Sequence, residues 1–229
     1  MTLSIIIPIY NEASNIQQLL LHLQKALYKP SQCEIIVIDG GSMDTSVEKA
    51  TAIKGITVVT SPKGRGLQMN YGAQLAKANT LYFLHADSFP PFHFDKLILE
   101  AINNKKKAGC FRMQFDRNHW WLQLAGWFTQ FNLKFFRGGD QSLFITKDLF
   151  MSLGQFPTKY PIFEDYEVIR KLYQKNEFTV IQQKIISSSR RYTENGIMKL
   201  QYHYWMLYLK KWAGSPTQDL LIYYKKNIK

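Results

Sequence analysis

The sequence predicts an α/β fold, in which a mostly parallel central sheet is flanked by helices and followed by a C-terminal helical extension. Along the first half of the chain, short and almost continuous apolar runs alternate with segments whose apolar residues recur at helical spacing. Such runs are typical of strands buried on both faces, and repeated strand–helix units join parallel strands through right-handed crossovers. The 229 residues, 46% of them hydrophobic, suffice for one large domain or one domain with an appendage.

The first half of the chain contains four predicted strands. Residues 4–10 form the first, and the apolar residues of 16–27 then recur at helical spacing. The other three strands are 34–39, 56–60 and 80–85. A short helix from Thr45 follows the second strand, and a glycine-rich turn within 63–78 leads into the helix before the fourth.

The pattern changes after residue 105. Further strands are predicted at 107–115, 141–146 and 178–183, with a helix at 165–175. The aromatic-rich segment 119–137 is predicted to be helical. The tail, roughly from Asn195, is expected to form two helices, and Ser215–Pro216 caps the second with proline at its first position.

Composition limits the class of protein and its surroundings. A net charge of +12 fits nucleic acid, anionic lipid or a phosphorylated small molecule as partner, and a merely solvated basic surface is the alternative. The two cysteines lie far apart and outside any C-x-x-C pattern, which indicates a reducing compartment such as the cytoplasm. The first residues lack a basic region and meet Pro8 after a short apolar run, so they predict a strand and not a signal peptide. No stretch reaches the roughly 18–20 apolar residues of a membrane span.

Polar loops follow the predicted strands at the edge where an open parallel sheet binds ligands. These loops are 8–12, 39–44, 63–66 and 85–87. Their acidic residues and a glycine–arginine loop before a helix N-terminus predict an anion site, and Asp87 beside His85 suits a divalent metal with positions open to phosphate oxygens. Three structural alternatives stay open. Asp39 could form an Asx turn, Gly64 and Gly66 could serve backbone geometry, and Asp87 could cap the next helix.

Seven motifs, in order along the chain, carry a family resemblance: IIIPIYNE, IDGGSMDTS, GRGLQMNYGA, FLHADSFPP, GGDQSLFI, FPTKYPIFEDYEV and RRYTENG. Together they resemble the nucleotide-sugar-dependent glycosyltransferases of family 2, which have the GT-A (Rossmann-like) fold. The greatest similarity is to a compact bacterial subgroup with H-A-D in place of D-x-D. The resemblance implies a glycosyltransferase domain over residues 1–194 and a helical extension over 195–229, packed on or beside it.

The resemblance implies a donor site on the strand ends of the first half. A nucleoside diphosphate sugar, with UDP favoured over GDP, would be bound by Pro8, Tyr10, Glu12, Asp39, Gly41, Arg65 and Ala86. Asp39 would accept a hydrogen bond from the base, and Arg65 would approach the diphosphate. Arg190 and Arg191 would close over the diphosphate from the second half of the chain.

A divalent metal bridges the diphosphate in this family, and the resemblance assigns the metal to Asp87. His85 stands where the first carboxylate of D-x-D usually stands. A neutral imidazole ligates manganese but suits magnesium poorly, so manganese is favoured over magnesium. In the alternative, His85 only lines the ribose pocket and Asp87 binds the metal alone.

The resemblance places the acceptor in the second half. Glu164–Asp165 would be the catalytic pair, with Asp165 as the base that deprotonates the acceptor hydroxyl during an in-line, inverting attack. The same carboxylates could instead merely favour a helix N-terminus through its dipole. Gly139, Asp140 and Gln141 are expected to shape the acceptor and sugar pocket.

Aromatic and basic side chains gather in 119–137 and 202–212. One interpretation is core or a dimer face. The other is a hydrophobic acceptor channel or an interfacial helix, since Trp and Phe with flanking Lys and Arg suit a membrane boundary. With the +12 charge, this second interpretation predicts a hydrophobic or lipid-linked acceptor at an anionic membrane surface, with the protein peripheral at the inner face of the cytoplasmic membrane.

Two other functions fit parts of the pattern. A nucleotidyltransferase also combines a glycine-basic loop with a metal carboxylate, but usually directly after strand one, where this chain has YNEASN. A nucleic-acid- or membrane-binding module without catalysis should carry its positive charge on one face or stripe. The lysines here are scattered along the chain, so no specific nucleic acid is expected.

Overall fold

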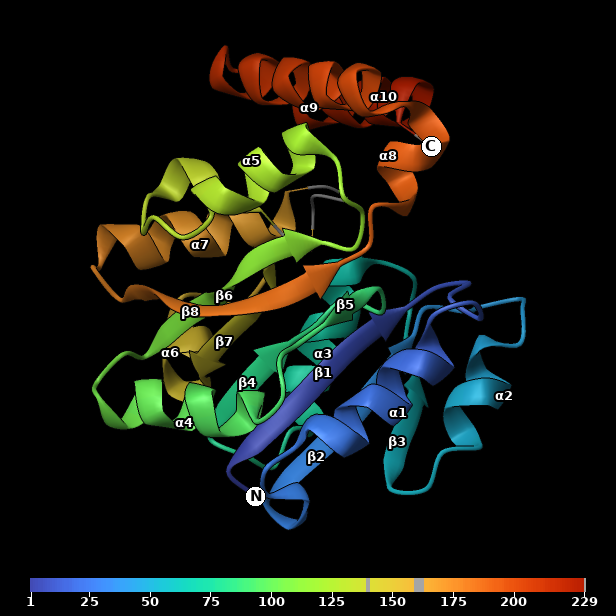
Figure 1. The fold of residues 1–229 in the computed structure, drawn as a ribbon, viewed down its shortest axis with the longest axis vertical. Coiled ribbons are helices and arrows are strands. Elements are labelled where there is room, and N and C mark those ends of the chain that lie inside the picture. Colours follow the sequence, from blue (N-terminus) through green and yellow to red (C-terminus); the bar gives the residue numbers. More distant parts are fainter. Residues whose placement is uncertain (139–140, 159–162, 229) are drawn as a thin grey trace.

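A central sheet organises the protein, whose computed structural model describes residues 1–138, 141–158 and 163–228. The strands are β1 (Leu3–Ile9), β2 (Cys33–Asp39), β3 (Ile56–Thr60), β4 (Thr80–Phe83), β5 (Ser88–Phe89), β6 (Ala108–Phe115), β7 (Leu143–Thr146) and β8 (Phe178–Ser187). Within these residues they form an eight-stranded sheet in the order β3-β2-β1-β4-β7-β6-β8-β5 (Figure 1).

The sheet is mostly parallel, as predicted. β3, β2, β1 and β4 run parallel to one another, and β6 is parallel to β8. β7 is antiparallel to both of its neighbours, and the short β5 is antiparallel to β8 at the edge. The parallel part therefore brings the carboxyl ends of β1, β2 and β4 together.

Helices cover both faces of the sheet (Figure 1). They are α1 (Ile16–Ala26), α2 (Ser46–Thr51), α3 (Arg65–Leu75), α4 (Phe94–Asn103), α5 (Trp120–Phe128), α6 (Lys147–Ser152), α7 (Glu164–Gln174), α8 (Arg190–Asn195), α9 (Ile197–Trp212) and α10 (Thr217–Asn227). Two 3₁₀ turns, η1 (Pro30–Gln32) and η2 (Lys134–Phe136), join them. Because alternate side chains of a strand point to opposite faces, β1 contributes to two apolar layers.

The two layers use different helices. Ile5 and Ile7 lie in the layer that includes side chains of α1, α4 and α5, whereas Ile6 lies in the layer with α3, α6 and α7. A side chain at Gly72 of α3 would collide with Ile6, so glycine allows this helix to approach the sheet closely. This approach brings the start of α3 to the strand ends.

The segment 119–137 departs from the prediction, because only residues 120–128 are α-helical. Beyond them, the Arg137 guanidinium donates hydrogen bonds to the carbonyl oxygens of Thr129 (2.7 Å) and Phe131 (2.6 Å). The Asn132 side chain donates to the carbonyl of Phe178 in β8 (2.8 Å). These tertiary contacts hold the segment in a compact loop that ends in η2.

The tail contains the two expected helices, α9 and α10, preceded by the short α8. Pro216 is the N-cap of α10 and not its first residue, so this helix begins one residue later than predicted. Leu200, Leu207 and Leu220 form a small apolar cluster between the two helices, which lie side by side above α5 in the view of Figure 1. Among the described residues, no helix combines the length and apolar character needed to cross a membrane. The domain boundary at residue 194 stays a prediction.

Candidate active site

The carboxyl ends of β1 and β4 open into one cleft with a volume of about 730 Å³. Its walls include these predicted site residues: Pro8, Tyr10, Glu12, Arg65, His85, Ala86, Asp87, Gln141, Asp165 and Arg191. Side chains that are separated by up to 183 residues in the sequence are thus brought together at one edge of the sheet. Asp39, Gly41, Glu164 and Arg190 lie next to the cleft without lining it, and Gly139 and Asp140 fall outside the described residues.

Asp39 ends β2 and is buried. Its carboxylate accepts hydrogen bonds from the backbone N–H groups of Gly41 (3.0 Å) and Ser42 (3.1 Å), which is an Asx turn. Gly41 adopts a φ of +86°, a conformation that suits glycine. Asp39 therefore forms the Asx turn that was the alternative to a binding role. Its hydrogen bond to the base of a nucleotide stays a prediction.

The loops after β1 and β2 are fixed to each other. The backbone N–H of Asn11 donates to Ser42 Oγ (2.8 Å), and the N–H of Glu12 donates to Ser46 Oγ (2.7 Å). A hydrogen bond from Ser46 Oγ is the main reason that the pKa of Asp44 lies below its ordinary value, and backbone N–H groups add to this effect. These bonds hold the two loops as one preformed wall.

Gln68 of α3 ties two strand ends together, which the sequence analysis missed. Its buried side-chain amide donates to the carbonyl oxygens of Ile9 and Ile38, each at 2.8 Å. A side chain at Gly40 would come within 3.0 Å of this amide. The available signal was the presence of two polar residues, Gln68 and Asn70, among the buried residues of the helix that follows the glycine-rich turn.

Arg65 and Glu164 form an ion pair across the site. Glu164 is 1% exposed and accepts a hydrogen bond from Arg65 Nε. Its second carboxylate oxygen is buried without a hydrogen-bond partner in the described part of the chain. Glu164 is thus bound to Arg65 and is not among the residues that line the main cleft, and its expected catalytic role stays a prediction.

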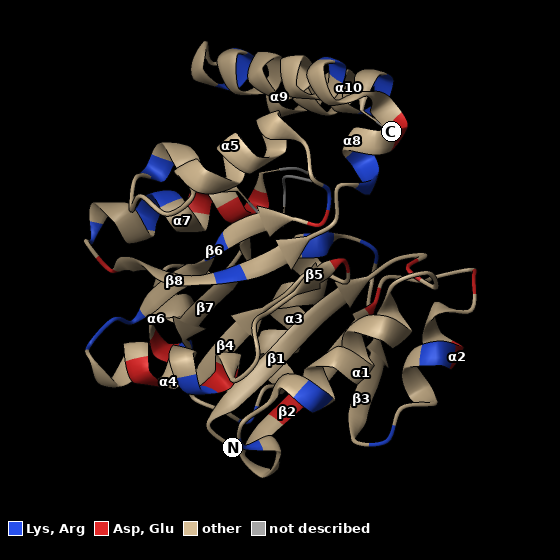
Figure 2. Ribbon diagram, viewed as in Figure 1, with Lys and Arg blue, Asp and Glu red and all other residues tan. Residues whose placement is uncertain are grey.

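Asp165 lines the main cleft and begins the acidic first turn of α7. Figure 2 shows this cluster of acidic residues at the start of α7, beneath the uncharged α5. One carboxylate oxygen accepts the backbone N–H of Tyr166 (2.9 Å). His85, Glu164 and Asp165 also share a small cavity of about 20 Å³ behind the cleft. The predicted base and the predicted metal ligand therefore meet at adjoining walls.

Arg190 and Arg191, the predicted arginine pair, contact different parts of the protein. Arg190 pairs with Glu12 (3.5 Å) and donates to Ser14 Oγ (3.4 Å), so it reaches the loop after β1. Arg191 lines the cleft and donates to the Tyr224 hydroxyl of α10 (3.2 Å). The segment just before the C-terminal extension is thereby linked both to the strand ends and to the last helix of the extension.

The sequence analysis did not single out two cationic side chains at the site, those of Lys63 and Arg137. Lys63 Nζ lies 3.4 Å from the centre of the Tyr10 ring and covers one face of it. Arg137 is buried, lines the cleft and donates to Gln141 Oε1 (2.7 Å) as well as to the loop carbonyls described above. Gln141 is thus held by Arg137 at the foot of the cleft.

Much of the remaining lining of the cleft is aromatic. Its lining from α5, the following loop, α9 and α10 includes Trp121, Phe128, Phe135, Phe136, Tyr204, Trp205, Tyr208 and Tyr224. Trp121 and Trp205 meet edge to face with ring centres 5.8 Å apart, which joins α5 to α9. The lining continues outward into an exposed group that we call the aromatic surface: Trp120, Trp127, Phe135, Trp205 and Trp212.

A comparison with models of protein families identifies the family of this chain. The model of glycosyl transferase family 2 matches residues 4–167, more than half of the chain. The chain belongs to glycosyl transferase family 2. The family-2 match spans the strand-end loops, Arg65 and the Glu164–Asp165 pair, and it ends before the C-terminal extension. The family resemblance is thereby confirmed, while the H-A-D subgroup stays a prediction.

Curated relatives share part of this family-2 chain. It is 32% identical over 135 residues to an undecaprenyl-phosphate 4-deoxy-4-formamido-L-arabinose transferase from Aeromonas hydrophila subsp. hydrophila, which covers 53% of this chain and 40% of the relative. The chain spans between 31% and 64% of the length of four curated relatives that it matches.

Solved structures share the fold of the family-2 chain. S. aureus TarS residues 1–349, in complex with UDP, is similar with a TM-score of 0.69 and 20% identity, over 82% of this chain and 60% of that one. The mannosyltransferase PcManGT from Pyrobaculum calidifontis, in complex with GDP-Man and Mn²⁺, is similar with a TM-score of 0.64 and 17% identity, over 90% and 59%. The expected GT-A fold is confirmed.

The donor set of this family-2 site fits a metal that is shared with a ligand. His85 and Asp87 offer one imidazole and one carboxylate at the end of β4. The described residues contain no group of three or more His, Cys, Asp or Glu side chains that could hold a metal ion. Phosphate oxygens and water would have to complete the coordination, which suits a metal bound together with a diphosphate.

Proposed function

We propose that this chain is an inverting glycosyltransferase that moves a sugar from a nucleoside diphosphate donor to a hydroxyl group of a hydrophobic or lipid-linked acceptor. One observation carries the proposal. A single cleft of about 730 Å³ is lined by the strand-end residues expected to bind the donor, by Asp165 and by a set of aromatic side chains. Donor and acceptor can therefore meet in this cleft beside Asp165.

The donor occupies the polar half of the cleft in this proposal. Pro8, Tyr10 and Glu12 line the base and ribose, and Asp39 favours uracil through a hydrogen bond to the base. Arg65, held from behind by Glu164, faces the diphosphate. Similar folds bound to UDP and to GDP-Man support a nucleotide sugar as the donor class, and UDP is favoured.

Asp87, with His85 beside it, would hold a divalent metal that acts as a Lewis acid on the leaving diphosphate. A mixed imidazole and carboxylate donor set favours manganese over magnesium, and the Mn²⁺ bound to PcManGT supports a divalent metal. Arg65 and Arg191 lie on the same cleft and are placed to stabilise the charge that grows on the diphosphate as the sugar–phosphate bond breaks.

Asp165 is the general base of the proposed reaction. It removes the proton of the acceptor hydroxyl while the hydroxyl oxygen attacks the anomeric carbon opposite the diphosphate. The new glycosidic bond forms as the sugar–phosphate bond breaks, so the configuration inverts. Asp87 cannot take this role because it is committed to the metal on the diphosphate side. Gln141, fixed by Arg137, shapes the pocket between the two substrates.

The acceptor enters along the aromatic half of the cleft. Aromatic side chains with flanking lysines suit the interface of an anionic membrane, and the name of the Aeromonas relative includes a lipid phosphate, undecaprenyl phosphate. We therefore assign the protein to a peripheral position at the inner face of the cytoplasmic membrane. A hydroxyl acceptor presented there would reach Asp165 without leaving the apolar surface.

A thermal-shift panel tests the donor half of this proposal. UDP-glucose, UDP-GlcNAc and GDP-mannose are each added with manganese, with magnesium and with a chelator. Binding to the folded state at a hundred times the dissociation constant raises stability by about 2.7 kcal/mol. We expect the largest rise with a UDP-sugar and manganese. No rise with any nucleotide sugar, or equal rises with and without metal, would contradict the proposal.

A further inference from the structure

The C-terminal extension reaches the start of α7 through one lysine. Lys211, in the last turn of α9, places its Nζ 3.7 Å from the centre of the Tyr166 ring and 4.3 Å from that of Phe163. These rings stand on either side of the Glu164–Asp165 pair in the sequence. A cation that stacks on both rings therefore fixes the position of α9 relative to the predicted base.

Lys211 is half-buried in a group of charges. Burial lowers the pKa of Lys211 to about 8, whereas the negative charges of Glu167 and Asp165 act to raise it. Two carboxylates of the group already pair with arginines, Glu164 with Arg65 and Glu167 with Arg170 (2.9 Å). Lys211 adds a positive charge from the extension to this group, close enough to interact with the charge of Asp165.

The neighbouring Lys210 offers a contrast within the same turn of α9. Its Nζ lies 5.5 Å from the ring centre of Tyr223 in α10, so it faces the inside of the extension. A lysine that only solubilised the helix end or packed the extension would behave like Lys210. The family-2 match ends at residue 167, so Lys211 lies outside the matched residues.

We propose that Lys211 is a positioning residue of the active site, which holds the extension over the start of α7 and keeps Asp165 ionised for proton abstraction. This inference rests on the proposed function, because it gives the extension a part in the same reaction. A positive charge within a few ångströms of a carboxylate favours its ionised form. The rings of Tyr166 and Phe163 fix where that charge stands, since a cation is attracted to the face of an aromatic ring.

Several other groups face Asp165 and enter any titration of it. Glu164, Glu167 and Arg170 lie on α7, and His85 reaches the same small cavity from the end of β4. Lys134 of η2 also lies over the Tyr166 ring, at 5.7 Å. These groups are unchanged when Lys211 is replaced, so a comparison of variants at 210 and 211 isolates the contribution of Lys211.

The test compares Lys211→Met with Lys210→Met. The reaction is release of UDP from UDP-glucose with manganese, with water as acceptor, and GDP-mannose is used if it stabilises the protein more. For Lys211→Met we expect the acid limb of kcat to move up by about one pH unit, so that kcat below the limb falls about tenfold. Donor affinity should stay within about twofold. Lys210→Met should match wild type, and Lys211→Arg should restore the profile because the cation remains.

The outcomes separate this inference from the proposed function. An acid limb that does not move in Lys211→Met would overturn the role of Lys211, and so would an equal movement in Lys210→Met. Lys211→Gln repeats the comparison if the Met variant does not fold. Turnover could be lost in Asp165→Asn while the acid limb of kcat stays unmoved in Lys211→Met and Lys211→Gln. This result would leave the proposed function standing without this inference. A wild type that turns over no nucleotide sugar would remove both.

Discussion

Side chains on the cleft wall are held by partners that lie behind them. Glu164 holds Arg65, Arg137 holds Gln141, and Ser46 and Ser42 hold the loop after β1. Groups that already stand where charge develops need little reorganisation during a reaction, which makes their electrostatic effect larger than in water. The residues behind the wall are therefore as important to test as those that line it.

Replacing Asp165 by asparagine should separate binding from chemistry. The isosteric amide cannot accept the acceptor's proton, so we expect transfer to slow roughly 10²–10⁴-fold, the usual range for loss of a general base. The UDP affinity should be unchanged, because Asp165 is not among the residues expected to bind the donor. Turnover and UDP binding are measured side by side.

Two control variants accompany this substitution. Glu167→Gln removes a carboxylate from the same helix turn, where Glu167 pairs with Arg170, and should leave turnover close to wild type. Equal losses in both variants would mean that the carboxylates act only on the helix N-terminus. Retained turnover in Asp165→Asn together with loss in Asp140→Asn would make Asp140 the base.

The two cysteines should make the free energy of unfolding depend on pH in the alkaline range. Burial raises the pKa of Cys33 to about 12, with the charge of Asp95 adding to the effect, and burial raises the pKa of Cys110 to about 11. Unfolded thiols lose their protons near pH 8.5. The folded state then binds more protons than the unfolded state, so the free energy of unfolding falls as pH rises above about 8.5.

Urea denaturation at pH 8 and pH 10 measures this effect. The double variant Cys33→Ser and Cys110→Ala should lose less of its free energy of unfolding between the two pH values than wild type does. In the folded protein at pH 8, alkylation by iodoacetamide should also be much slower than in protein unfolded by guanidinium, since the thiolate is the reactive form. Equal alkylation rates would contradict the raised pKa values.

At the scale of elements, α3 connects the sheet to the site. Gln68→Leu would keep most of the side-chain volume but remove the two hydrogen bonds to Ile9 and Ile38. We expect a loss of about 1–3 kcal/mol of stability and weaker UDP binding, because the ends of β1 and β2 are no longer tied. Gln74→Leu, at an exposed position of the same helix, is the control and should change stability by no more than about 0.5 kcal/mol. Urea denaturation and UDP titration of both variants check this.

The sequence predicts the long buried elements well and the short ones poorly. β1 and β2 match their predicted ranges within about one residue, because an apolar run buried on both faces has few alternatives. β3 also matches its predicted range, although it is an edge strand whose residues are only partly buried or exposed. β5 has only two residues, and its pairing of Ser88 with Ser187 is set by the fold rather than by local pattern. The loop after α5 likewise depends on contacts that Arg137 and Asn132 make elsewhere.

The same distinction holds for the site. Loops that follow parallel strands must meet at one edge of the sheet, so their residues could be predicted to converge. Lys63, Gln68 and Lys211 could not be found in this way, because each acts through a ring or carbonyl brought near by packing. The division of Arg190 and Arg191 between two different partners also depends on where the extension docks.

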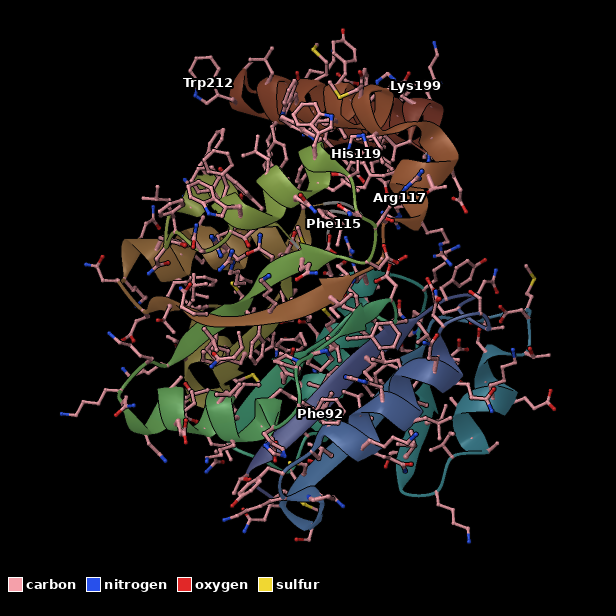
Figure 3. The ribbon with its side chains drawn as sticks, in the orientation of Figure 1. Phe92, Phe115, Arg117, His119, Lys199 and Trp212 are labelled. Atoms are coloured by element: carbon pink, nitrogen blue, oxygen red, sulfur yellow. The ribbon has the colours of Figure 1, made fainter. Side chains whose placement is uncertain are left out.

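At the scale of the whole molecule, the extension and α5 create an apolar end on a strongly basic protein. The net charge is +12, while α5 carries no charged residue and appears uniformly tan in Figure 2. Phe135 is 91% exposed and Trp212 is 86% exposed. Figure 3 shows Trp212 projecting from the end of α9, whereas the exposed Phe92 lies far from it, beside the sheet. Large exposed aromatic side chains at one end of a soluble fold commonly mark an interaction surface.

Vesicle flotation tests whether this end binds a membrane. Wild-type protein should float with vesicles rich in phosphatidylglycerol at low salt and less at high salt, because screening weakens the attraction of its positive charge to anionic lipid. The double variant Phe135→Ser and Trp212→Ser should float poorly, since two large apolar side chains no longer enter the interface. Phe92→Ser, a matched loss of one exposed aromatic away from this end, should float like wild type. Wild-type protein that stays at the bottom of the gradient at low salt would leave the aromatic surface as a contact between protein molecules, and its acceptor would then have to reach Asp165 from solution.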